Sequence, residues 1–69
     1  MKYNVVDFSC DDQLDVHLNL IGVEINRKNR EELRFMGVEL KLHNNCEAVR
    51  HLELQCYASR KDNIVRLLK

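Results

Sequence analysis

The sequence predicts an α+β, mainly β domain: an antiparallel four-stranded β-meander with long bent central strands and a short C-terminal helix. Apolar and polar residues alternate from Leu14 to Leu20, a segment around each of the two glycines is repeated, and the 69 residues include no proline. Alternation with a period of two is typical of a strand with one buried face. A chain without proline can also form long, uninterrupted strand pairings.

The repeat defines the two central strands. Residues 18–25 read LNLIGVEI, and residues 33–40, fifteen positions later, read LRFMGVEL. This spacing suits a long strand followed by a turn. In a hairpin centred on Asn29, apolar residues face apolar residues on both sides of the glycines, and a slip of one residue breaks every pair. The pairs are Val16–Leu42, Leu18–Leu40, Leu20–Val38, Val23–Phe35 and Ile25–Leu33.

The remaining elements follow from turn residues and spacing. A first strand at Val6 and Phe8 pairs with the second through a turn at residues 9–13. Asn44 and Asn45 tolerate positive φ, so we expect a turn there and a fourth strand over residues 48–58. Residues 63–69 place apolar side chains on one helical stripe, with Ser59 or Asp62 as the cap.

An apolar patch is the predicted protein interface. Beyond the glycines, the apolar side chains move to the other face of the sheet, and a helix of about nine residues is too short to cover both faces. Either paired bulges at the glycines turn both sets into one core, or the second set is exposed and binds another chain. We favour binding, with a protein partner or a homodimer. The interface residues are Val23, Ile25, Leu33 and Phe35.

Length, cysteines and charge narrow the protein class. A chain of 69 residues and 8.2 kDa has room for a single compact domain, residues 1–69. Three cysteines cannot all pair within one chain, which indicates the reducing cytoplasm. We also expect no signal peptide and no membrane span.

The charges are unevenly distributed along the chain. Residues 1–26 carry five acids and one base, whereas residues 27–69 carry ten bases and six acids. This asymmetry of −4 against +4 can orient a partner.

Residues that could support catalysis or bind metal do not form a recognisable motif. His43, Cys46, His51 and Cys56 are of the types that bind zinc, but they lack the usual ligand spacings. Cys10 stands beside Asp11 and Asp12, and neighbouring carboxylates disfavour the thiolate that a nucleophile needs. We therefore expect no metal, no cofactor and no enzymatic activity.

Two functions remain, and the first is favoured. The chain is predicted to be a non-enzymatic protein-binding module, a small regulator or inhibitor that sterically blocks a larger protein partner. Phage inhibitors and immunity or antitoxin proteins share this size, which is an analogy and not a signal in the residues. The alternative is nucleic-acid binding by the basic hairpin tip at residues 26–30, through Arg27, Lys28 and Arg30 with Arg34 after it.

Overall fold

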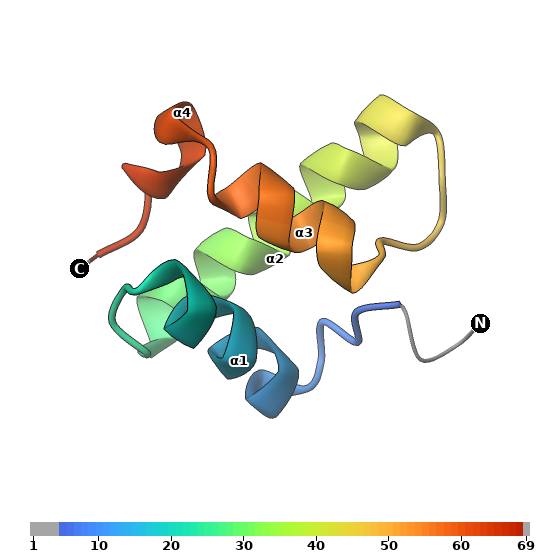
Figure 1. The fold of residues 1–69 in the computed structure, drawn as a ribbon. Coiled ribbons are helices and arrows are strands. Elements are labelled where there is room, and N and C mark those ends of the chain that lie inside the picture. Colours follow the sequence, from blue (N-terminus) through green and yellow to red (C-terminus); the bar gives the residue numbers. More distant parts are fainter. Residues whose placement is uncertain (1–4, 69) are drawn as a thin grey trace.

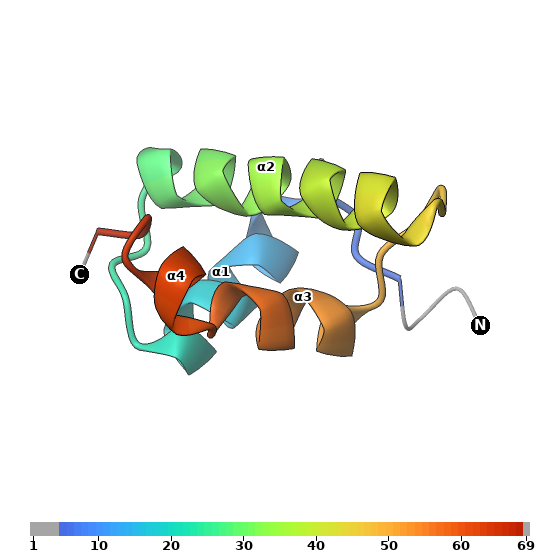
Figure 2. The same ribbon diagram turned by 90° about the horizontal axis from the view of Figure 1, so that it is seen from above.

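The computed structural model describes residues 5–68, and these residues fold into four helices. They are α1 (Asp11–Ile21), α2 (Arg27–Asn44), α3 (His51–Ala58) and α4 (Lys61–Ile64). Helix α2 forms one layer, and the three shorter helices pack beneath it (Figure 2). In Figure 1, α3 crosses in front of α2, and α1 and α4 lie on opposite sides of α2. One long face of α2 is therefore left without a covering helix.

The prediction of a mainly β meander is wrong. The structure is 64% helical with 3% strand, and residues 5–68 form no sheet. The extended contact within this range is an isolated bridge between Val5 and Arg50, next to a 2.8 Å hydrogen bond from the Val6 amide to the Val49 carbonyl. The predicted second and third strands are α1 and α2, and the predicted fourth strand is mostly α3. A short helix does form near the C-terminal end, at residues 61–64. Of the predicted helix 63–69, residues 65–68 form turns and coil, and Lys69 lies outside the described residues.

The segment of α1 fits two periodicities, which explains the error. Leu14, Val16, Leu18 and Leu20 alternate as in a strand, but Leu14, His17 and Leu18 also follow the i, i+3, i+4 spacing of a helix. In the structure Leu14, His17 and Leu18 are buried, whereas Val16 and Leu20 are more than half exposed. The strand interpretation failed because it counted the buried histidine as a solvent-facing residue.

The two glycines of the repeat have unrelated roles. Gly22 ends α1 with φ of 88°, and its amide donates to the carbonyls of Leu18 and Asn19. This left-handed conformation is the usual end of a helix at glycine. Gly37 lies inside α2 against the Phe8 ring, where an added Cβ would come within 2.3 Å of a ring carbon. The fifteen-residue repeat therefore does not correspond to a repeated structural unit.

Two asparagines set the ends of α2. The Asn26 side chain accepts a 2.8 Å hydrogen bond from the amide of Asn29, which caps the first turn. Asn45 ends the helix with φ of 52°. The prediction that residues 44–45 adopt positive φ is thus confirmed at Asn45, although the turn ends a helix and does not join two strands.

Arg50 precedes α3, and its amide donates to the Glu53 carboxylate at 2.9 Å, which satisfies one free donor at that helix start.

The core lies between α2 and the three helices below it. The core side chains come from all four helices or their flanking turns. They are Val6, Leu14, Leu18, Val23, Leu33, Met36, Leu40, Val49, Leu54, Ala58 and Leu67.

Candidate functional site: the outer face of helix α2

The outer face of α2 carries an apolar stripe. Phe35, Val38 and Leu42 are 61%, 53% and 78% exposed. Their spacing of three and four residues places them on one side of the helix. Leu33, Met36 and Leu40 occupy the opposite side and enter the core. We call Phe35, Val38 and Leu42 the outer stripe.

A shallow apolar hollow adjoins the N-terminal half of the stripe. Glu31 and Arg34 form its polar margin, and Phe35 and Val38 form the rest of its lining. Neighbouring exposed apolar side chains on a helix are typical of a binding surface, whereas single ones are common everywhere. The stripe and the hollow form one continuous apolar surface.

Cations follow one edge of the outer stripe. Arg27, Arg34 and Lys41 recur every seven residues, on the side of α2 that faces α1 and the segment before it. The Arg34 guanidinium donates to the Phe8 carbonyl and to the Asp11 carboxylate, both at 2.7 Å. The Lys41 ammonium lies 5.4 Å from the centre of the Phe8 ring. These contacts hold two of the three cations in place.

Carboxylates follow the other edge. Glu32 and Glu39 are seven residues apart, and Arg66 joins them with contacts of 3.2 Å to Glu32 and 2.9 Å to Glu39. The Tyr57 hydroxyl also donates to Glu39, at 2.7 Å. The hydrogen bonds from Arg66 and then from Tyr57 hold the pKa of Glu39 below its usual value. Glu39 is therefore a fixed anion at neutral pH, and the two edges of the stripe carry opposite charge.

The four residues predicted as a protein interface are not together on one surface. Val23 and Leu33 are buried in the core, at 9% and 0% exposure. Ile25 is partly exposed in the connection between α1 and α2, and Phe35 lies on the outer stripe. The helical spacing of Phe35, Val38 and Leu42 is the signal that identifies the stripe, whereas the predicted hairpin pairs Val38 with Leu20 and Leu42 with Val16.

The predicted basic tip is the first part of α2, not a hairpin loop. Arg30 forms a two-bond ion pair with Asp15, at 2.7 and 3.1 Å, and Arg34 pairs with Asp11. Arg27 lies 3.3 Å from Glu31. The acidic N-terminal part of the chain and the cations of α2 thus meet within the molecule. Of the four predicted contact residues, Lys28 is the one for which residues 5–68 show no ion pair.

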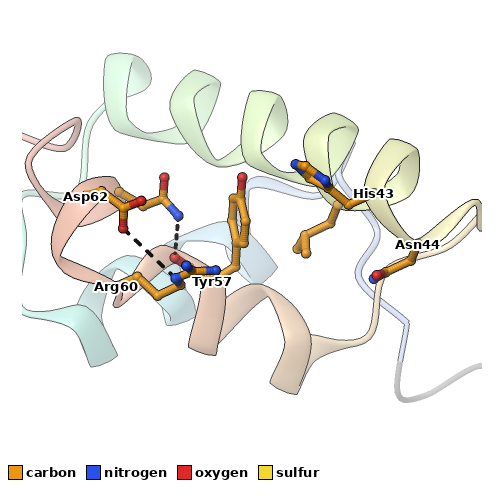
Figure 3. A pocket seen from close by; sticks show the side chains of 7 residues that line it. His43, Asn44, Tyr57, Arg60 and Asp62 are labelled. Atoms are coloured by element: carbon orange, nitrogen blue, oxygen red, sulfur yellow. Dashed lines mark hydrogen bonds and ion pairs between the residues drawn. The ribbon is translucent and has the colours of Figure 1, made fainter.

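A polar hollow lies where the end of α2 meets α3 and α4 (Figure 3). His43 and Asn44 border it from α2, and Tyr57, Arg60 and Asp62 border it from below. Arg60 lies 3.9 Å from Asp62, and the Asn63 amide donates to the Tyr57 carbonyl at 2.8 Å. Since these groups have partners within the hollow, they do not converge on a vacant point as ligand-binding groups do.

The candidate zinc residues do not gather. Across residues 5–68, no group of three or more histidine, cysteine or acidic side chains is placed to hold a metal ion. His51 contacts His17 instead: the His17 Nε2 and His51 Nδ1 atoms are 2.9 Å apart, and the rings stack. Gln55 lies 2.6 Å from the other His17 nitrogen. The pair of the buried His17 and the half-buried His51 joins α1 to α3.

Comparison of the chain with protein-family models, with curated proteins and with solved structures finds no match. None of the helices in residues 5–68 is long and apolar enough to cross a membrane. The interpretation of function therefore depends on the surface of the molecule.

Proposed function

We propose that this protein is a non-enzymatic protein-binding module, a small regulator that acts by covering part of a partner's surface with the outer face of α2. The observation that carries this proposal is the outer stripe: three large apolar side chains, each more than half exposed, in line on the longest helix. An amphipathic helix that presents such a row typically binds an apolar groove or another helix.

The fold supports a rigid surface. Helix α2 is held from below by three core side chains, Leu33, Met36 and Leu40, and its two edges are tied to α1 and to Arg66 by ion pairs. Because the stripe is ordered before binding, little conformational entropy is lost when a partner covers it. Binding to such a surface excludes other molecules from the partner's contact area, which is the steric mechanism proposed here.

The reducing cytoplasm is the location we propose. Cys10, Cys46 and Cys56 are free thiols, and Cys46 and Cys56 are exposed. Exposed free thiols are compatible with a reducing compartment, because they oxidise readily outside it.

Affinity capture from a lysate of the source cells tests the function. We expect wild-type protein to retain a partner in stoichiometric amount, and Phe35→Asp to lose it. Leu52→Asp is the matched control, because Leu52 is 73% exposed on α3, away from the outer stripe. Retention of the same proteins by Phe35→Asp contradicts the proposal. Loss of all retained protein after nuclease treatment points to the nucleic-acid alternative.

A further inference from the structure

We infer that the outer face of α2, where no other protein covers it, binds a second copy of this chain, with the two α2 helices side by side and parallel. The inference rests on the proposed function, because it names what the outer stripe binds. It follows from the spacing of the stripe and from the charges along its two edges.

The stripe has the spacing of a coiled-coil seam. Phe35, Val38 and Leu42 are separated by three and then four residues, which corresponds to successive a, d and a positions of a heptad. Glu31 and Lys28 continue the same line toward the start of α2. The apolar part of the seam therefore occupies the C-terminal half of the helix, and polar residues flank it.

The charges along the two edges favour a parallel pair, although Glu31 then faces Glu31 of the second copy at the polar end of the seam. In a parallel pair, the residue before each a position faces the residue five places later on the other helix. This rule places Arg27 opposite Glu32 of the second copy and Arg34 opposite Glu39 of the second copy. In an antiparallel pair, the cationic edges would face each other and so would the acidic edges, which is repulsive.

The existing ion pairs extend across such an interface without conflict. Arg34 already pairs with Asp11, and Glu39 already pairs with Arg66. Contact between Arg34 and Glu39 of the second copy gives a row of four charges that alternate in sign. The side chains of Arg34 and Glu39 are each 37% exposed, so both are open to this contact.

The apolar contact is short, which sets the strength of the dimer. Three side chains from each copy form the seam, so the interface belongs with weak, exchanging contacts and not with permanent dimers. The association should depend on protein concentration and should weaken in high salt, because solvent-exposed charge pairs flank the seam.

Sedimentation of the purified full chain up to about 1 mM tests the partner. We expect a dimer whose fraction rises with concentration, a monomer for Phe35→Asp and Leu42→Asp, and a dimer for the control Leu52→Asp. Circular dichroism of each variant should show unchanged helix content. A chain that remains monomeric overturns the second copy as partner, while capture of a different protein that Phe35→Asp loses would still support the proposed function.

Disulfide trapping tests the orientation. In a chain with serine at the three native cysteine positions, Glu31→Cys should cross-link to itself on oxidation, because position 31 faces position 31 in a parallel pair. Linkage of Glu31→Cys to Leu42→Cys in a mixture, without self-linkage of position 31, identifies an antiparallel pair and overturns the inference. A dimer that Phe35→Asp leaves intact uses another surface, and it overturns the inference.

Discussion

The side-chain amide of Asn29 pairs with the backbone of Leu68 as one strand residue pairs with another. Asn29 Oδ1 accepts from the Leu68 amide at 2.7 Å, and Asn29 Nδ2 donates to the Leu68 carbonyl at 2.7 Å. The same Nδ2 donates to the Glu24 carbonyl at 2.6 Å. Asn29 is fully buried, so one side chain joins the start of α2, the loop before it and the C-terminal segment.

Replacing Asn29 with alanine should destabilise the fold by about 2–4 kcal/mol, because several backbone groups lose their partner in a buried place. Urea unfolding measures the loss, and hydrogen exchange at the Leu68 amide should accelerate. Asn44→Ala is the matched control, since Asn44 is exposed at the end of α2 and should change stability by less than about 0.5 kcal/mol. Similar effects at both positions would contradict the role of the buried amide.

Replacing Gly37 with alanine should destabilise the protein, although alanine is favoured over glycine in a helix by about 1 kcal/mol. The added methyl would overlap the Phe8 ring, whose nearest carbon lies 2.3 Å from the Cβ position. We expect a net loss of about 1–3 kcal/mol from the displaced ring. Thermal unfolding measures it, and combining Gly37→Ala with Phe8→Leu should recover part of the loss. A stabilised single variant would show that Phe8 moves aside freely.

Stability should fall as pH falls below the ordinary histidine pKa of about 6.5. Burial lowers the pKa of His17 in the folded protein. The hydrogen bond with Gln55 partly opposes this lowering, and the smaller electrostatic effect of His51 adds to it. The unfolded chain therefore binds a proton that the folded chain excludes, and stability rises with pH between the two pKa values. The slope contributed by His17 is at most about 1.4 kcal/mol per pH unit.

Urea unfolding between pH 5.5 and 7.5 checks this pH dependence. His17→Gln should flatten the slope in this range, whereas His43→Gln, at an exposed position, should leave it as in the wild type. An unchanged slope in His17→Gln would assign the effect to another group.

Replacing Arg66 with alanine should lower the stability of the fold more than the same replacement at Arg27. Arg66 is 28% exposed and contacts Glu32, Glu39 and Asn63, whereas Arg27 is 89% exposed and, within residues 5–68, forms an ion pair with Glu31. We expect Arg66→Ala to cost about 1–2 kcal/mol and Arg27→Ala less than about 0.5 kcal/mol, because solvent screens the exposed pair. Chemical denaturation compares the two variants. Equal losses would show that the Arg66 contacts add no more than an ordinary surface pair.

Residues that act on their own backbone could be interpreted without a structure. The prediction of a positive-φ position at Asn44 or Asn45 is confirmed at Asn45, which adopts φ of 52°. The same reasoning applied to Asn26 as a helix cap would have located the start of α2. The choice between helix and strand was wrong because the apolar residues of α1 satisfied both periods, and the exposed Val16 and Leu20 made the strand pattern more regular.

The positive φ at Asn45 depends on the preference of that residue's own backbone, and the amino-acid sequence alone was enough to predict it. The places of His17, Asn29 and Glu39 depend on residues far away in the chain. His17 is buried because Gln55 and His51 bind its ring, and Asn29 is buried because Leu68 satisfies its amide. Buried polar groups are stable only where such partners meet them. Tertiary packing therefore decided which apolar side chains remained outside, and left Phe35, Val38 and Leu42 on the surface.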